Sequence, residues 1–345
     1  MLRSMYSGIS GMKVNQTKLD VVGNNIANVS TTAFKGSQAR FKDMLYQNAG
    51  YASSPSATKG GTNAKQVGLG AQLSSINKLM GQGNAMSTGR NLDVCIDGEG
   101  YLIVCSGYAE DGKIAAIDRN TDGTVKSSEN IDQTSYTRDG NLTLDEHGNL
   151  LTADGYRVMG YTMGEDAKIT YAKETKNGVN KGDAIVTVSA DAGTQSTKAT
   201  ASGKLVPLAI PDSIMVGTNS EKVKTFTIGK DGTITATTAS GKFVIGQIAT
   251  ASFKNPEALQ GIGGNLLQDG ANTGGAVIRS GRLVAAANDN SAGYGDFIQG
   301  ALEGSNVDLT EQFTDMIVAT RAFQASSKMI SNGDEILQTI TGLVR

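Results

Sequence analysis

A run of oxygen-bearing residues between positions 118 and 129 has the spacing of a calcium-binding loop. The segment DRNTDGTVKSSE matches the EF-hand loop pattern D-x-[DN]-x-[DN]-G-x5-E at every specified position. In such loops carboxylate, amide and backbone carbonyl oxygens surround the ion, and a glycine allows the sharp turn. The ligands predicted by this pattern are Asp118, Asn120, Asp122, the backbone carbonyl of Thr124, and Glu129, with Gly123 at the turn.

The residues that follow this loop do not complete an EF-hand. An EF-hand continues as an amphipathic helix, whereas the next segment, NIDQTSY, is short and leads into a strand-like stretch. Turns rich in Asp and Gly also occur without metal, because these residues favour tight backbone conformations. The sequence therefore leaves two interpretations, a calcium site or an acidic turn, and it requires no cofactor.

Catalytic chemistry is not indicated elsewhere, and we expect no enzyme. The single histidine, His147, lies in the turn-like segment DEHGN, which disfavours histidine-based triads and multi-histidine metal sites. Cys95 and Cys105 flank a predicted hairpin whose turn would not place them opposite each other, so free, half-buried thiols are expected rather than a disulfide. Trp is absent and the acidic residues are scattered through turns. This composition disfavours a secreted hydrolase or a carbohydrate-binding module, which remains the alternative from another class.

Two long helices, one near each end of the chain, are the predicted elements that organise the rest. In both segments apolar residues recur every seven positions. Such a period places them on one stripe of a helix and predicts packing along another helix. The stripe residues, which we predict to drive assembly, are Met5, Met12, Leu19, Ile26, Leu309, Met316, Phe323, Ile330, Leu337 and Val344.

The two helices are expected to pair with each other, in an antiparallel or staggered arrangement. Asp308, followed three residues later by Glu311, is a capping-box pattern that predicts the start of the second helix. The small residues between its stripe positions, which would let a partner backbone come close, are Ala319, Ser326 and Gly333. The first helix contains Gly8, Gly11 and Gly23. Each glycine costs about 1 kcal/mol relative to alanine, so this helix needs tertiary or intersubunit contacts.

Composition and patterning predict an α+β protein, with long, paired, coiled-coil-like terminal helices flanking β-rich central domains. The 345 residues carry a net charge of −2 and only 19% charged residues, which indicates neither a nucleic-acid surface nor an acidic tail. No stretch is apolar enough to span a membrane, and no conventional secretory signal is expected. The predicted domains are a helical domain (1–34 and 305–345), a linker or extended arm (35–70), a β-rich domain (71–161 and 246–304, with an insert at about 107–133), and a small outer β-rich domain (162–245).

Several sequence blocks resemble the bacterial flagellar rod and hook family, in the family's order and over most of the chain. The most specific blocks are LDVVGNNIANVST near the start and SNVDLTEQFTDMIVATRAF near the end. Others are GGTNAKQVGLG, STGRNLDVCIDGEGYLIV, YTRDGNLTLDEHGNLLTADGYRVMGY and GQIATASFKNPEALQGIGGNLL.

This resemblance implies an axial structural protein, exported unfolded by the flagellar type III apparatus and polymerised into a helical tube. Within the family the chain resembles hook subunits most, because residues 162–205 add a polar segment where distal rod proteins would have a short connection. The expected function is that of a flexible, extracellular hook that transmits torque from rod to filament, with the distal rod as the alternative. The implied partners are further copies of the chain, the rod and hook–filament junction proteins, the hook cap and the export apparatus, with no nucleic acid and no membrane.

Overall fold

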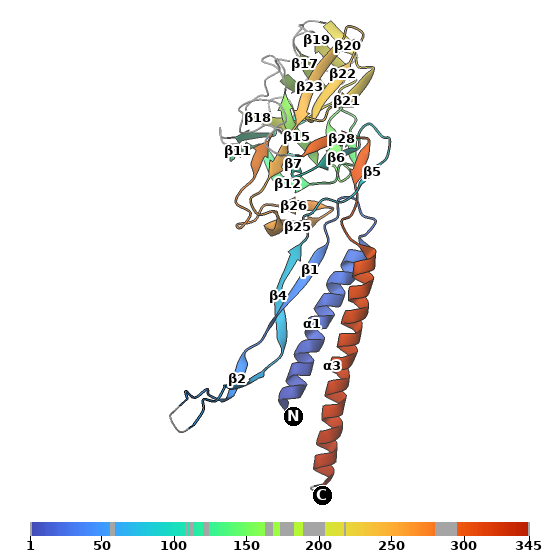
Figure 1. Cartoon of the computed structure of the whole chain (residues 1–345). Coiled ribbons are helices and arrows are strands. Elements are labelled where there is room, and N and C mark those ends of the chain that lie inside the picture. Colours follow the sequence, from blue (N-terminus) through green and yellow to red (C-terminus); the bar gives the residue numbers. More distant parts are fainter. Residues whose placement is uncertain are drawn as a thin grey trace. The chain divides into compact units, whose positions relative to one another are not determined.

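The computed structural model (Figure 1) describes residues 2–55, 59–107, 109–110, 113–119, 124–162, 168–172, 183–188, 204–216, 219–279 and 295–343. These residues form an α+β protein, with a long helix toward each end and strands between them. The chain divides into two compact units. The first unit contains residues 1–30, 35–81 and 305–345, and the second contains residues 31–34 and 82–304.

The first unit is built on helix α1 (Leu2–Ala27) and helix α3 (Leu309–Leu343), which lie side by side (Figure 1). The N-terminal end of α3 is capped as predicted: the Asp308 carboxylate accepts hydrogen bonds from the backbone amides of Thr310 at 2.8 Å and Glu311 at 3.3 Å. These bonds satisfy two of the amides that a helix start leaves without an intrahelical partner. In the described part of the chain, neither helix is long and apolar enough to cross a membrane.

A β-ribbon completes the first unit; it spans the predicted linker or extended arm (35–70) and the first residues of the predicted β-rich domain. Strand β1 (Ser37–Asp43) pairs antiparallel with β4 (Ala71–Lys78), and β2 (Tyr46–Gly50) pairs with β3 (Lys65–Gly68). The β1–β4 register shifts between Arg40 and Phe41. Antiparallel pairing satisfies the backbone donors and acceptors of this polar segment, so it forms an ordered ribbon although its composition is typical of a linker.

The second unit is β-rich, and its largest sheet contains strands from most of its length. The main path of that sheet is β11-β10-β18-β15-β7-β12-β26-β25, and β16, β17, β19 and β20 form a separate four-stranded sheet. The strands are β5 (Ala85–Ser87), β6 (Val94–Asp97), β7 (Tyr101–Gly107), β8 (Ala109–Glu110), β9 (Lys113–Ile114), β10 (Ala116–Arg119), β11 (Val125–Glu129), β12 (Ile131–Thr137), β13 (Leu142–Leu144), β14 (Leu150–Thr152), β15 (Arg157–Thr162), β16 (Lys168–Tyr171), β17 (Ala184–Val188), β18 (Lys204–Pro207), β19 (Ser213–Val216), β20 (Asn219–Lys222), β21 (Thr225–Ile228), β22 (Thr233–Thr237), β23 (Lys242–Ile248), β24 (Thr250–Ser252), β25 (Gln260–Gly263), β26 (Leu266–Gln268), β27 (Val277–Arg279), β28 (Asp296–Gln299) and β29 (Ala301–Glu303), with a short 3-10 helix at Pro256–Ala258.

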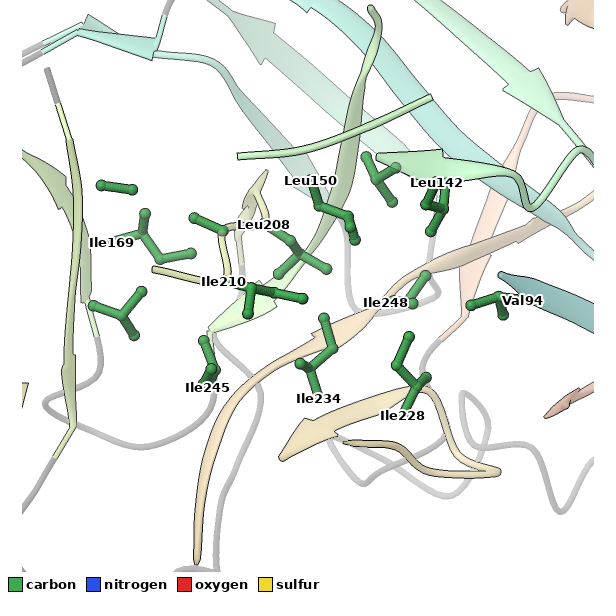
Figure 2. Close-up of a cluster of buried hydrophobic side chains, with 14 of the residues drawn as sticks. Val94, Leu142, Leu150, Ile169, Leu208, Ile210, Ile228, Ile234, Ile245 and Ile248 are labelled. Atoms are coloured by element: carbon green, nitrogen blue, oxygen red, sulfur yellow. The ribbon is translucent and has the colours of Figure 1, made fainter. Parts of the chain in front are cut away.

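One hydrophobic core runs through this unit (Figure 2). It joins Val94 and Leu150 to Ile234, and it also includes Ile169 and Ile214, which lie within the predicted outer domain. In the described residues, the segment predicted as a small outer domain therefore shares its buried side chains with the predicted first β domain.

The predicted hairpin between β6 and β7 is wrong. Strand β6 pairs with β28, with Cys95 opposite Ile298, whereas β7 pairs with β12, β15 and β24. The turn after β6 lies close to the segment before β28: Gly98 has a φ of +114°, and a Cβ there would lie 2.9 Å from the Cα of Gly295. The close approach of the later segment gives β6 a partner that is distant in the chain.

The two cysteines are free, as predicted, but both are completely buried rather than half-buried. Burial raises the pKa of the Cys105 thiol to about 12, which disfavours the reactive thiolate. The turn expected at DEHGN is present: β13 pairs with β14 through a turn in which the Gly148 amide donates to the Asp145 carbonyl at 3.1 Å. Gly148 has a φ of +83°, a conformation that glycine adopts without strain.

Candidate assembly surface

The predicted stripes bring α1 and α3 together as an antiparallel pair. A Cβ on Gly333 would lie 3.1 Å from the side chain of Met5, and one on Gly8 would lie 3.2 Å from the side chain of Ile330. Contacts later in α1 are therefore made to earlier residues of α3. The stripe residues that are half-buried are Met5, Met12, Leu19, Ile26, Met316, Phe323, Ile330 and Leu337. Leu309 is exposed, and Val344 lies outside the described residues.

Small residues form the closest part of this helix pair. Gly8 is buried, and a Cβ there would also lie 3.4 Å from the backbone carbonyl oxygen of Ser326. A Cβ on Gly11 would lie 3.1 Å from the Ser326 hydroxyl, and Ala319 is almost fully buried. Gly8 and Gly11, which weaken α1 as an isolated helix, thus permit its close packing against α3. Close approach of the two backbones was predicted from the small residues of α3. Gly23 differs, because a Cβ at this position would have no atom within 4 Å.

Polar contacts between the helices were not predicted from the sequence. The Lys18 ammonium donates to the Asp315 carboxylate at 2.9 Å. Asn25 is only 2% exposed; its amide group donates to Gln312 at 2.9 Å, and it exchanges hydrogen bonds with the backbone of Ser37. The sequence does contain an indication for Asn25, which follows Val22 by three residues and so lies on the same, inward face of the helix. A buried asparagine at that position needs a hydrogen-bond partner.

Other large apolar side chains of α3 remain exposed. They are 43% to 81% exposed, and they do not belong to the predicted stripe. Toward the C-terminal end of the helix they are Met329, Ile336, Ile340 and Leu343, and toward its start they are Phe313, Ile317 and Val318.

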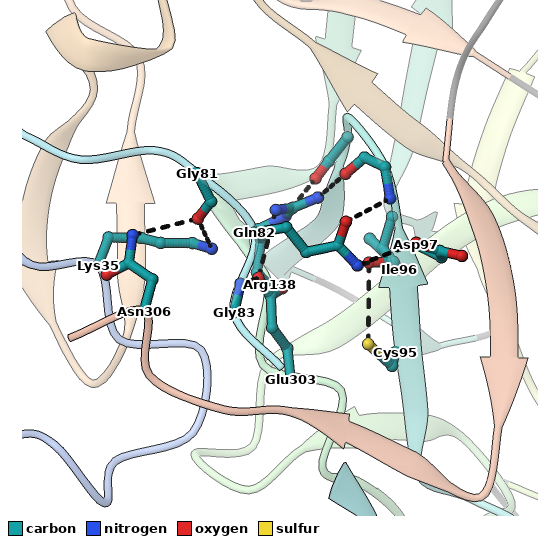
Figure 3. A network of polar contacts seen from close by, with 12 residues as sticks. Lys35, Gly81, Gln82, Gly83, Cys95, Ile96, Asp97, Arg138, Glu303 and Asn306 are labelled. Carbon is teal, nitrogen blue, oxygen red and sulfur yellow. Dashed lines mark hydrogen bonds and ion pairs between the residues drawn. The ribbon is translucent and has the colours of Figure 1, made fainter. Parts of the chain in front are cut away.

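Polar networks fix chain segments within each unit (Figure 3). In the first unit, the Lys35 ammonium donates to the Gly81 carbonyl at 2.8 Å, and the Asn306 amide donates to the carbonyls of Leu79 and Gly81. In the second unit, the Arg138 guanidinium lies 3.4 Å from the Glu303 carboxylate, and both side chains are buried. Arg138 also donates to the carbonyls of Gly98 and Gly100, and the amide of Gly83 donates to Glu303.

The predicted calcium ligands are only partly described. Asp118 and Glu129 lie in the antiparallel β10–β11 hairpin, while Asn120 and Asp122 lie outside the described residues. The Lys204 ammonium lies 3.3 Å from Asp118 and 3.6 Å from Glu129. Hydrogen bonding and attraction by Asp118, with a smaller contribution from Glu129, raise the pKa of Lys204. Within the described residues, no group of three or more His, Cys, Asp or Glu side chains is placed to hold a metal ion.

Comparisons with known proteins identify the family. Three family models match: a flagellar basal body rod protein model at residues 5–35, a flagellar hook protein FlgE/F/G D1 domain model at residues 120–236, and a flagellar basal body rod FlgEFG C-terminal model at residues 298–343. The flagellar basal-body rod protein FlgG of Bacillus subtilis is 38% identical, with the alignment covering 100% of both chains. The chain belongs to the flagellar rod and hook axial protein family.

Other members of the rod and hook family match over the full chain. The rod protein FlgG of Agrobacterium fabrum is 28% identical over 99% of this chain and 98% of its own. The hook protein FlgE of Borreliella burgdorferi is 29% identical over 99% of this chain and 100% of its own. Its alignment spans 448 positions, more than the 345 residues here, so that hook protein contains segments that this chain lacks. The chain is thus a flagellar structural protein, and the family models match residues 5–27 of α1 and the whole of α3.

Proposed function

We propose that this protein is a structural subunit of the flagellar hook, which polymerises into a flexible tube and transmits torque from rod to filament. The observation that carries polymerisation is the helix pair, which half-buries one apolar stripe of α3 and leaves other large apolar side chains of this helix exposed to water. Exposed contiguous apolar surface is a mark of protein–protein contact. Copies of the same chain are the partner that a tube requires.

The assignment to the hook rests on the segment between β15 and β21. There the chain forms the four-stranded sheet of β16, β17, β19 and β20, with Ile169, Val186 and Ile214 buried. The family resemblance implies only a short connection at this point in distal rod proteins. In the hook, this sheet would contribute to the outer part of the tube, in contact with the rod and the hook–filament junction proteins at its two ends and with the hook cap during growth, after type III export.

A distal rod subunit is the second candidate. It is favoured by the 38% identity to a protein named as FlgG, compared with 29% for a hook protein. The alignments to the rod proteins of Bacillus and Agrobacterium span 346 and 344 positions, so those rod proteins have almost no segment that this chain lacks.

Electron microscopy of basal bodies from a deletion strain separates these candidates. For a hook subunit, we expect complete rods that carry no hook, and gene complementation should restore hooks of normal length. Antibody against the protein should label the hook outside the cell envelope. Truncated rods, or label confined to the rod, would instead assign the protein to the rod.

Polymerisation through the helix pair is tested with paired substitutions on α3. Phe323→Asp with Ile330→Asp places two charges on the stripe that packs against α1, and we expect a soluble subunit that forms no tubes. The matched control is Gln324→Asp with Ser331→Asp, which places the same charges at the same spacing on exposed positions. Normal tubes from the first variant would exclude the stripe as a requirement for assembly.

A further inference from the structure

The two cysteines of the second unit face away from a core that their own strands help to build. Cys95 and Cys105 are completely buried, yet neither belongs to the hydrophobic core of this unit. Side chains alternate between the two sides of a strand, so each thiol points to the side of its strand opposite the core. The residues of β6 and β7 that do belong to the core are Val94, Ile96, Leu102 and Val104.

Each thiol is held in a different sheet. Cys95 lies opposite Ile298 in the two-stranded sheet of β6 and β28, and Figure 3 shows its thiol beside this part of the chain. Cys105 lies opposite Thr134 in the largest sheet, and its Sγ donates to the sulfur of Met159 at 3.1 Å. The two thiols therefore have separate surroundings, although only nine residues lie between them in the sequence.

A disulfide between these cysteines does not fit this arrangement. Such a bond needs Cα atoms within about 7 Å of each other and Cβ atoms that point toward each other. A bridge would draw β7 back onto β6, whereas β7 is paired with β12, β15 and β24. Turning one strand over to direct its thiol toward the other would move its alternate side chains to the opposite face. The two core residues of that strand would then leave the core.

In the unfolded chain nothing keeps the two thiols apart. A loop of about ten residues closes in roughly 10–100 ns, and a free cysteine ionises near pH 8.5. In the folded chain burial raises the pKa of the Cys105 thiol to about 12, and both sulfurs are closed off from solvent. Thiol oxidation is therefore open to the unfolded chain and closed to the folded one.

We propose that Cys95 and Cys105 form a redox switch on folding. A disulfide between them, formed in the unfolded chain, prevents the second unit from folding, and the completed fold keeps both thiols reduced. A species that only the unfolded chain can form draws molecules away from the folded state by mass action. The inference goes beyond the proposed function and holds for a hook subunit and a rod subunit alike.

The oxidant in this switch is a low-molecular-weight disulfide such as glutathione disulfide. One thiolate of the unfolded chain attacks a sulfur of the external disulfide, forms a mixed disulfide and releases one glutathione thiolate. The second thiolate attacks the protein sulfur of the mixed disulfide and releases the other. The chain gains one S–S bond in place of two S–H bonds, and the external disulfide is reduced to two thiols that take up the two protons.

Oxidation of the full chain before and after folding tests the switch. The reduced chain is treated with glutathione disulfide either in concentrated urea or in its folded state, and the bridged chain is identified by mass spectrometry. We expect the bridge to form in urea, and at least about a hundredfold more slowly in the folded chain, because both thiolate and access are lacking there. On removal of urea, the bridged chain should not regain the near-ultraviolet circular dichroism and protease resistance of the reduced chain. Dithiothreitol should restore both.

The control is the double variant Cys95→Ala with Cys105→Ala, which should refold equally well with and without glutathione disulfide. The wild-type comparison needs no variant, so it stands even if the alanines weaken the fold. The proposal is overturned if the bridged chain regains the structure of the reduced chain, or if no bridge forms in urea. Formation of the bridge in the folded chain as fast as in urea would overturn it as well.

Discussion

Lys18 of α1 and Asp315 of α3 form an ion pair of 2.9 Å between two helices from opposite ends of the chain. The two side chains are 24% and 36% exposed, so the pair is worth up to about 1 kcal/mol. Its larger effect is on register, because it joins one turn of α1 to one turn of α3. The same antiparallel register brings Gly8 to Ile330 and Met5 to Gly333.

Charge reversal at this ion pair should weaken the helix pair, and a double reversal should restore it. Lys18→Asp or Asp315→Lys alone places like charges together, whereas the double variant re-forms an opposite pair. The measurement is the free energy of unfolding of the first unit in a double-mutant cycle, at low and high salt. A loss in the double variant equal to the sum of the two single losses would show that the contact contributes nothing specific.

Gly8 and Gly23 should respond in opposite ways to substitution by leucine. At Gly8 the new side chain would collide with Ile330 and the Ser326 carbonyl, so the helices must separate and tube formation should be lost. At Gly23 no atom lies within 4 Å of the Cβ position, and replacing glycine should raise helix stability by up to about 1 kcal/mol. Circular dichroism of the subunit and sedimentation of the polymer measure the two effects. Loss of assembly in both variants would point to a general requirement for glycine rather than to close packing.

The buried Arg138–Glu303 pair should be essential for the second unit. Arg138→Met leaves the Glu303 carboxylate, which is almost fully buried, without its guanidinium, and we expect a loss of about 3 to 5 kcal/mol in unfolding free energy. Glu303→Met together with Arg138→Met should cost less than Arg138→Met alone, because no unpaired charge is then buried. Urea unfolding of the full chain measures both. A double variant less stable than the single one would contradict this account.

Alkaline pH should destabilise the second unit through buried Tyr171. Burial, with a smaller contribution from Asp145, raises the pKa of its phenol to about 12, and the hydroxyl donates to Asn149 at 2.8 Å. In the unfolded chain the phenol ionises near pH 10. The folded state therefore holds the proton between about pH 10 and 12, and stability that is complete below pH 10 is lost as pH rises through this range.

The control for this alkaline effect is Tyr171→Phe. At pH 8 it should be less stable than the wild type by about 1 kcal/mol, because the hydrogen bond to Asn149 is lost. Toward pH 12 the difference should shrink, since phenylalanine does not titrate. Urea midpoints that stay equally separated at both pH values would exclude Tyr171 from the pH dependence.

Calcium binding at residues 118–129 stays a prediction. The position of Lys204 provides a specific variant with which to test it. An ion bound by Asp118 and Glu129 must displace the ammonium that lies beside both. We expect Lys204→Met to bind calcium more tightly than the wild type and Glu129→Gln to bind it more weakly, in isothermal titration of the full chain. Bound calcium should raise the unfolding temperature of the second unit by mass action. If no variant released or absorbed heat at millimolar calcium, the result would show that the loop is an acidic turn and not a calcium site.

Local spacing determined the terminal helices and the start of α3. The seven-residue period and the Asp308 cap act within a few residues of the chain, and both appear where they were predicted. The β13–β14 hairpin follows from local turn residues in the same way. The predicted oxygen ligands of the calcium loop can be recognised by their spacing. That spacing gives no information about Lys204, whose ammonium lies beside Asp118 and comes from β18.

Tertiary structure alone decided which partners these elements take. The stripe of α3 that faces α1 was predicted, but the contact of Lys18 with Asp315, which joins one turn of each helix, appears only in the structure. Strand β6 was expected to pair with its neighbour in sequence, yet it pairs with β28. A strand presents the same backbone donors and acceptors to any partner, so its choice depends on the side chains that the whole unit buries together. Periodicity describes one element's surface, whereas pairing depends on two surfaces that only the folded chain brings together.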